Sequence, residues 1–278
     1  MAIVITGAST GIGFSLAEQL AGQGYTVFAG ARKQEDLNRL GDAHANIRPV
    51  ALDVCNPEQV NALVKLLRNE NIKVDALINN AGVAVIGPLE IQSDDDLQWQ
   101  METNLIGTAR MIRSLLPFLR ETKGRIINVS STSGLVAWPF AGAYVASKYA
   151  IEGLSDVLRV ELRRFGIETV LINPGAVATP LWEKTFSAVH EKLARQPDDI
   201  RKFYEADSKR SEDAVRKSVD KAVKPEIVVN TVLEALAAKK PKPRYLVGPS
   251  AKIQWWMRVL LSTQWFDKLK YKIVYGNN

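Results

Sequence analysis

Two side chains of this sequence, Tyr144 and Lys148, have the types and the spacing that acid–base chemistry requires. They lie four residues apart at the start of a predicted helix, so they share one face of it. An isolated phenol has a pKa of about 10. A fixed ammonium beside it favours the phenolate, which predicts a lowered pKa for Tyr144. Tyr144 would then protonate the alkoxide formed when a ketone is reduced, and would take the hydroxyl proton in the reverse direction. Taken by itself, the pair could equally be a helix-surface contact.

A glycine-rich segment over residues 6–13 follows the first predicted strand and leads into an amphipathic helix. Glycines there allow a sharp turn and let a pyrophosphate approach the helix N-terminus, where free N–H groups and the helix dipole favour anions. This arrangement predicts a dinucleotide site, with a glycine turn of no further function as the alternative. The cofactor-binding residues expected here are Gly7, Ser9, Thr10, Gly11, Ile12 and Gly13.

The end of the second predicted strand indicates which dinucleotide would bind. Folds that select NAD place an acid there, which bonds the ribose 2′-hydroxyl. This chain has Arg32 and Lys33 instead. Guanidinium pairs well with phosphate, so two cations predict a 2′-phosphate and hence NADP(H). The alternative is a pair of solvated surface cations, for which Glu35 and Asp36 would compete.

The elements that must position these residues alternate along the chain. Short β-branched runs are predicted as strands at 2–6, 25–30, 47–52, 76–79, 125–130, 167–173 and 244–247. Helical patterns lie between them at 12–23, 57–70, 94–120, 143–165 and 225–238. This order predicts an α/β protein: one Rossmann domain with a doubly wound parallel sheet of about seven strands and helices on both faces. Several strands are apolar at consecutive positions, as expected when both faces are covered.

Five motifs in this order make the chain resemble the classical short-chain dehydrogenase/reductase superfamily, over nearly all of residues 1–250. They are the glycine segment, Asn79-Asn80-Ala81-Gly82, Asn104, Ser131 with Tyr144-Val145-Ala146-Ser147-Lys148, and Pro174-Gly175-Ala176-Val177-Ala178-Thr179. The hydroxysteroid and retinol dehydrogenase branches are similar around 139–162. The resemblance implies hydride transfer between nicotinamide and a secondary alcohol or ketone.

The resemblance also implies roles for single residues. Ser131 would hydrogen-bond the reacting oxygen, Lys148 would also hold the nicotinamide ribose, and Asn104 would position a water in the proton relay to the lysine. Around the cofactor, Asp53 and Val54 would flank the adenine, and Thr179 would reach the nicotinamide carboxamide. The further cofactor residues implied are Asn80, Ala81, Gly82, Pro174, Gly175 and Val177.

The substrate is expected to be apolar and lipid-like, such as a steroid, a retinoid or a fatty-chain carbonyl. The candidate contacts are Trp138, Phe140, Leu181, Trp182 and Phe186. A reductase of small polar carbonyls and a non-catalytic NADP(H) sensor are the alternatives, although a sensor would not need Ser131, Tyr144 or Lys148. Residues 181–224 form a charged insertion that is predicted to be a lid over the site.

Charge is concentrated at the end of the chain. The formal net charge is +6, yet residues 239–278 hold nine basic side chains and one acid, so the rest is slightly acidic. The aromatic and basic extension 251–278 is either a peripheral membrane contact or a helix that covers the pocket or a subunit interface. A homo-oligomer, dimer or tetramer, is expected, and a nucleic-acid partner is not. No metal site is predicted, because neither histidine has neighbouring ligands in the sequence. One cysteine and no signal peptide favour the cytoplasm.

Overall fold

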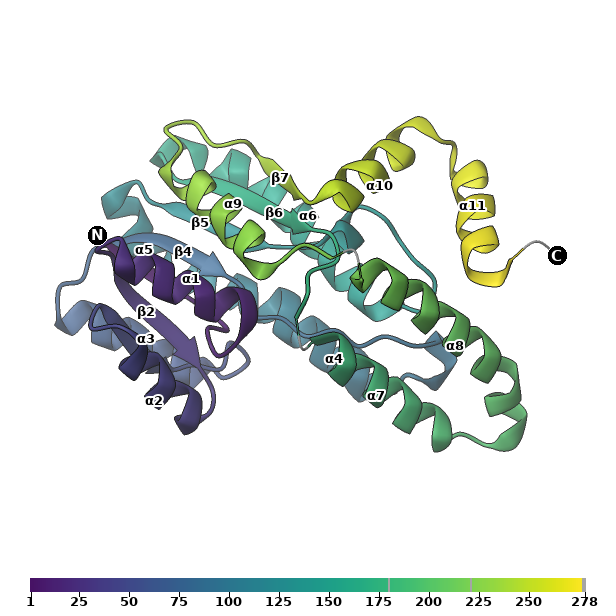
Figure 1. Ribbon diagram of the computed structural model, residues 1–278. Coiled ribbons are helices and arrows are strands. Elements are labelled where there is room, and N and C mark those ends of the chain that lie inside the picture. Colours follow the sequence, from purple (N-terminus) through teal and green to yellow (C-terminus); the bar gives the residue numbers. More distant parts are fainter. Residues whose placement is uncertain (180, 221, 277–278) are drawn as a thin grey trace.

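A computed structural model describes residues 1–179, 181–220 and 222–276 and shows a seven-stranded parallel sheet in the order β3-β2-β1-β4-β5-β6-β7 (Figure 1). The strands are β1 Ala2–Ile5, β2 Thr26–Ala31, β3 Ile47–Ala51, β4 Val74–Asn79, β5 Arg125–Val129, β6 Glu168–Pro174 and β7 Arg244–Val247. The order reverses between β1 and β4, which is where doubly wound sheets bind their ligands. The predicted Rossmann fold is confirmed.

Helices cover both faces of this sheet, and further helices are appended at one end of it (Figure 1). They are α1 Gly11–Gly22, α2 Gln34–Ala43, α3 Pro57–Asn69, α4 Asp94–Met101, α5 Thr108–Thr122, α6 Gly142–Glu161, α7 Leu181–Ala194, α8 Asp198–Val219, α9 Pro225–Ala237, α10 Pro249–Leu260 and α11 Thr263–Tyr275. A π-helical turn at Glu102–Gly107 joins α4 to α5. One strand shows why two layers form. Ile3 and Ile5 join the apolar core with α1 and α9, whereas Val4 joins the core with α3 and α5. Alternate side chains of a strand point to opposite faces, so all of β1 is buried.

Three elements differ from the sequence prediction. The α2 helix was not predicted, because only Leu40 of its ten residues is buried and its apolar pattern is sparse. The single helix expected at 94–120 is two helices joined by the π-helical turn. The helical spacing in the C-terminal extension belongs to two helices, α10 and α11, separated at Leu261 and Ser262.

The appended helices lie together at one end of the molecule. Helices α7 and α8, which fill the insertion, and the α10–α11 pair stand beyond the carboxyl ends of the central strands (Figure 1). None of the 22 residues of α8 is buried. Within the described part of the chain, no helix is long and apolar enough to cross a membrane.

Candidate active site

The turn between β1 and α1 brings three backbone segments into contact. Gly7 has a positive φ of 65°, and a Cβ added there would lie 2.7 Å from the Ala81 Cα. A Cβ added at Gly13 would lie 2.3 Å from the Gly7 carbonyl oxygen. Only glycine fits such approaches. The glycines therefore do more than make a turn, because they let the turn, the start of α1 and the loop after β4 pack backbone against backbone.

This turn leaves the N-terminus of α1 open to an anion. Thr10 precedes the helix without a side-chain capping bond, and the first turn holds no acid. Unpaired N–H groups at a helix start bind phosphate oxygens. The residues present thus fit the pyrophosphate of a dinucleotide, with Ser9, Gly11 and Ile12 around it.

The loop after β4 is fixed to the glycine turn. The Thr6 hydroxyl accepts hydrogen bonds from the Asn80 and Ala81 N–H groups at 3.1 and 3.0 Å. The Asn80 side chain donates to the Gly7 carbonyl at 2.9 Å. Gly82 follows, and a Cβ added there would lie 3.4 Å from Asn104 Oδ1 and 3.8 Å from Lys148 Nζ. Gly82 is therefore the place where the predicted dinucleotide site adjoins the predicted catalytic residues.

Cations gather at the start of α2. Arg32 and Lys33 are exposed, and neither has an ion pair within the described residues. Asp36, a possible competitor for them, pairs instead with Arg39 at 2.6 Å. Arg39 also donates to the Ser9 carbonyl of the glycine turn. Arg39 was missed in the sequence because α2 itself was not predicted. It adds a third cation beside the predicted 2′-phosphate site.

The strand ends supply the remaining cofactor candidates. Asp53 accepts the Cys55 N–H at 2.9 Å, and Val54 is buried. A Cβ added at Gly11 would lie 3.7 Å from the Thr179 methyl group, so Thr179 lies beside the glycine turn. The other candidates lie at the end of β6 and just after it. Pro174 ends β6, and the Gly175 N–H donates to the Val247 carbonyl at 3.1 Å. Val177 forms an isolated β-bridge with Val223.

Tyr144 and Lys148 lie on the first turns of α6, as predicted from their spacing. The Lys148 ammonium is buried, lies 5.8 Å from the centre of the Tyr144 ring and donates to the Val129 carbonyl at 3.0 Å. Burial lowers the pKa of Lys148 to about 8, and the nearby Glu152 carboxylate opposes this change.

The expected lowering of the Tyr144 pKa is wrong for this arrangement. Burial raises the pKa of this phenol, and a hydrogen bond with the Ser131 hydroxyl only partly offsets the rise. The reason is that the ammonium faces the ring and a backbone carbonyl, while desolvation disfavours the phenolate. Tyr144 is therefore held as a neutral proton donor, and Ser131 is its hydrogen-bond partner.

Asn104 lies in the π-helical turn between α4 and α5. Its amide accepts the Val83 N–H at 2.9 Å and donates to the Val83 carbonyl and the Ser147 hydroxyl, both at 3.0 Å. Such turns are frequent at functional sites. The side chain thereby fixes the chain just after Gly82 to α6, while the water relay expected of Asn104 stays a prediction.

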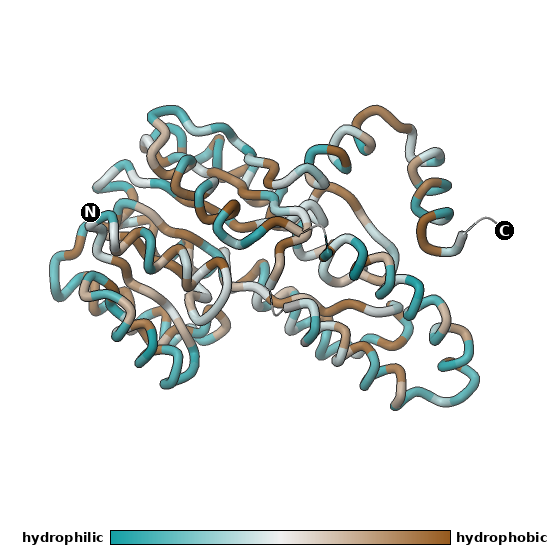
Figure 2. The backbone as a smooth tube through the Cα atoms, in the orientation of Figure 1, coloured by the Kyte–Doolittle hydropathy of each residue, from teal (hydrophilic) through white to brown (hydrophobic). Residues whose placement is uncertain are grey.

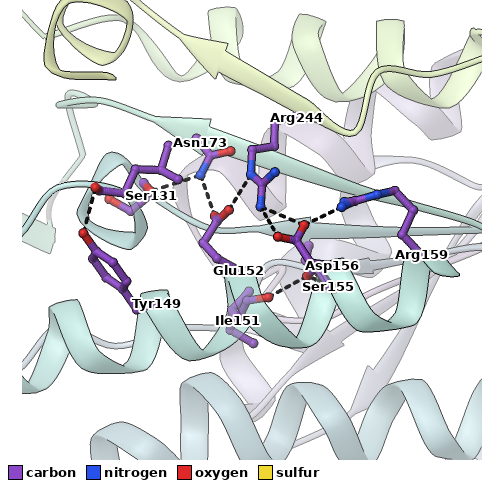
Figure 3. Close-up of polar contacts among 11 residues, drawn as sticks. Ser131, Tyr149, Ile151, Glu152, Ser155, Asp156, Arg159, Asn173 and Arg244 are labelled. Carbon is purple, nitrogen blue, oxygen red and sulfur yellow. Dashed lines mark hydrogen bonds and ion pairs between the residues drawn. The ribbon is translucent and has the colours of Figure 1, made fainter. Parts of the chain in front are cut away.

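A buried polar network holds the backbone at Ser131, the predicted catalytic serine (Figure 3). The Asn173 amide donates to the Ser131 carbonyl at 3.1 Å and to Glu152 at 2.6 Å. Arg244 of β7 bonds the other Glu152 oxygen at 2.8 Å and both Asp156 oxygens at 2.8 Å. Sequence reasoning missed this network. Two features of the sequence could have indicated it: Asn173 lies within an apolar predicted strand, and Glu152 follows Lys148 by one helical turn.

A cleft of about 620 Å³ opens beside the start of α6. Two predicted substrate residues, Trp138 and Phe140, contribute to its wall, whereas Tyr144 and Ser131 do not. The full lining is Gly87, Pro88, Leu89, Glu90, Trp138, Pro139, Phe140, Gly142 and Tyr204. Gly142 begins α6, two residues before Tyr144. Glu90 and Tyr204, which sequence reasoning missed, bond each other across the cleft at 2.6 Å.

Three predicted substrate residues, Leu181, Trp182 and Phe186, lie in the insertion. Phe186 is buried and lines a second, smaller hollow together with Phe140. Trp182 stacks on Phe186 at 6.3 Å between ring centres and donates to the Val177 carbonyl at 2.9 Å, so it packs the base of α7. The side chain of Leu181 lies outside the described residues. Among those described, no group of three or more His, Cys, Asp or Glu side chains could hold a metal.

Comparison with known proteins shows the family of this chain. The family model for short chain dehydrogenase matches residues 1–190. The chain is 34% identical to 3-ketodihydrosphingosine reductase of Bacteroides thetaiotaomicron, covering 90% of this chain and 89% of that protein. It is 32% identical to NADPH-dependent 3-dehydrocapnine reductase of Ornithobacterium rhinotracheale, covering 97% and 95%.

A solved structure extends this likeness to three dimensions. A short chain dehydrogenase from Burkholderia cenocepacia J2315 in complex with NADP superposes with a TM-score of 0.75 at 26% identity, covering 96% of both chains. The family model thus matches more than half of the chain, and both relatives exceed 30% identity over most of their length. The chain belongs to the short-chain dehydrogenase/reductase superfamily and is a nicotinamide-dependent oxidoreductase of alcohols and ketones.

Proposed function

We propose that the protein is an NADP(H)-dependent reductase or dehydrogenase of an apolar, lipid-like ketone or secondary alcohol. The observation that carries this proposal is the convergence of Lys148 and Asn104 on Gly82, directly beside the glycine turn. When bound, the nicotinamide supplies or accepts the hydride. The chain supplies the proton, because Tyr144 is a neutral donor bonded to Ser131.

Comparing the wild type with Tyr144→Phe on a panel of ketones with NADPH tests the reaction. Losing the general acid costs about 10²- to 10⁴-fold in rate, so kcat should fall by that amount while NADPH binding persists. Equal rates in the two proteins would leave the non-catalytic sensor as the better description. The panel should pair long-chain ketones with small polar ones, since the second class is the alternative substrate.

The choice of NADP(H) rests on Arg32 and Lys33. Both are exposed and without an acidic partner in the described chain, so a 2′-phosphate would gain their charge without breaking an ion pair. One relative is named as NADPH-dependent. Arg32→Asp should weaken NADPH binding by about 1.5–3 kcal/mol and leave NADH binding much less affected. Lys65→Asp, an exposed change on α3, is the matched control, and a wild-type preference for NADH would refute the choice.

The lipid-like substrate rests on the wall of the cleft. Apolar side chains and backbone make up most of it, and its two polar side chains, Glu90 and Tyr204, are bonded to each other. The name of one relative is that of a reductase of a keto sphingoid base. Helices α7 and α8 would act as the lid, since Tyr204 reaches the cleft from α8.

We also propose a homo-oligomer built on α6. This helix exposes 53% of Val157 and 75% of Val160, and Ile106 beside it is 43% exposed. A twofold contact would bury these apolar surfaces against their copies. Val160→Glu should produce monomers in sedimentation equilibrium, whereas Ile227→Glu on α9 should not. A wild type that sediments as a monomer would contradict the proposal.

A further inference from the structure

The two C-terminal helices, α10 and α11, form a hairpin, and one side of it packs on the loop between β5 and α6. Phe266 is buried against Leu135 and Val136 of the loop that lines the cleft. The Trp138 indole donates to Gln254 at 3.2 Å, and the Lys270 ammonium donates to the Ala137 carbonyl at 3.2 Å. Part of the aromatic content of the extension, Phe266 above all, is therefore used to pack the hairpin onto the body.

The opposite side of the hairpin has no such explanation. The exposed fractions of its apolar side chains are high for residues of this size. They are Ile253 at 59%, Trp256 at 58%, Val259 at 52%, Leu260 at 74% and Trp265 at 66%. We call these five residues the outer face. Four of them lie at i, i+3, i+6 and i+7 along α10, and Trp265 lies in the first turn of α11. Figure 2 shows hydrophobic backbone where the two helices meet.

Cations lie beside the outer face. Lys252 precedes Ile253, and Lys268 and Lys272 extend the row that begins at Trp265, with the Lys268 ammonium 5.1 Å from that ring. Arg258 adds a fourth exposed cation. None of these four has an ion pair within the described residues, because Asp267, the acid of the hairpin, pairs with Lys270 at 2.7 Å. The surface therefore combines exposed tryptophans with uncompensated positive charge.

This combination decides among the possible occupants. A second copy related by a twofold axis would bring two faces of the same positive charge together, with no acid among the described residues of the hairpin free to compensate it. A bilayer surface takes apolar and indole groups at the level of the headgroups and pairs the cations with anionic phosphates. The hairpin stands at the edge of the molecule (Figure 1), and α11 contacts α8, so a flat surface could reach the exposed outer face. We propose that the outer face of the α10–α11 hairpin binds the surface of an anionic lipid bilayer without crossing it.

Co-sedimentation of the full-length protein with vesicles tests the proposal. The wild type should pellet with vesicles of phosphatidylcholine and 30% phosphatidylserine, should pellet little with phosphatidylcholine alone, and should be released by 0.5 M salt. Each lysine near such a surface strengthens binding about fivefold, so K268Q/K272Q should weaken partitioning about 25-fold. W256A/L260A should weaken it at least as much. Matched controls are K239Q/K240Q in the loop before β7 and Ile227→Ser on α9, both expected to bind as the wild type does.

Three results would overturn the proposal. They are equal pelleting of the hairpin variants and the controls, equal binding to neutral and anionic vesicles, and self-association without lipid that the hairpin variants abolish. NADPH binding and thermal unfolding should stay unchanged in every variant, which excludes misfolding as the cause. Ketone reduction in solution is measured separately, so failure of membrane binding leaves the proposed function intact.

Discussion

The cofactor side and the substrate side of this molecule are held together by different forces. Around the glycine turn, backbone packs on backbone, and β1 beneath it is wholly buried. Beside the cleft, α8 has no buried residue and is held by side-chain pairs, which join Arg216 to Glu183 at 2.7 Å and Tyr204 to Glu90 at 2.6 Å. The predicted dinucleotide site thus lies in the part that tolerates least change, and the predicted substrate contacts lie in the part that tolerates most.

The difference has an energetic basis. Exposed ion pairs each contribute about 0–1 kcal/mol, so α8 can separate from the body at low cost. Displacing the glycine turn would disturb two apolar cores. On the lid proposal, a substrate would enter by movement of α8 while the dinucleotide site keeps its shape. Three experiments test whether the two sides differ in this way.

The largest effect is expected from Gly13→Ala. Its Cβ would lie 2.3 Å from the Gly7 carbonyl and 2.5 Å from the Asn80 amide. Overpacking of this kind costs about 1–3 kcal/mol or more in unfolding free energy, and displacing the turn should abolish measurable NADPH binding. Gly22→Ala in the same helix is the control, since nothing lies within 4 Å of its added Cβ. If thermal melts and NADPH titrations cannot distinguish the two variants, the cofactor side is not rigid.

An effect of intermediate size is expected from Glu152→Gln, and it is measured in the pH dependence of the rate of ketone reduction. The pKa of Lys148 is about 8, so the wild-type rate should fall as the pH rises through this value and the ammonium loses its proton. The Glu152 carboxylate raises that pKa, so its removal should move the alkaline limb to lower pH.

Asp156→Asn is the control for this experiment. It also loses contacts with Arg244, but its carboxylate is not a cause of the Lys148 shift. Its alkaline limb should stay at the wild-type position. If the alkaline limb moved equally in Glu152→Gln and Asp156→Asn, the network would act by holding the structure around Lys148 and not by the charge of Glu152.

The smallest effect is expected from Arg216→Gln. The guanidinium joins α8 to Glu183 of α7 and is 43% exposed, so its loss should cost no more than about 1 kcal/mol of unfolding free energy. The KM for the ketone should change a few fold while NADPH binding does not. Arg201→Gln breaks a pair within α8 and should change neither. An altered NADPH affinity in Arg216→Gln would contradict the separation of the two sides.

The parts that could be predicted are those encoded by local spacing. Tyr144 and Lys148 share a helix face because they are four residues apart, and the glycine turn follows from strand, glycines and helix in succession. Arg244 meets Glu152 across 92 residues of chain, a contact that no local pattern indicates. The sign of the Tyr144 pKa shift could not be predicted either, because burial decides it and burial depends on tertiary packing.

Phe140 links these regions in a way that bears on the size of substrate the enzyme accepts. Its φ is +62°, a left-handed conformation that costs a bulky residue about 1–3 kcal/mol. Its carbonyl is held by the Gly87 N–H at 2.6 Å, and its ring meets Tyr275 edge-on at 6.5 Å. Because Phe140 lines both hollows, losing Tyr275 should let it relax and merge them. Tyr275→Ala should then raise kcat/KM for long ketones relative to short ones. Tyr275, at the end of the last helix, would thereby limit the chain length of the substrate.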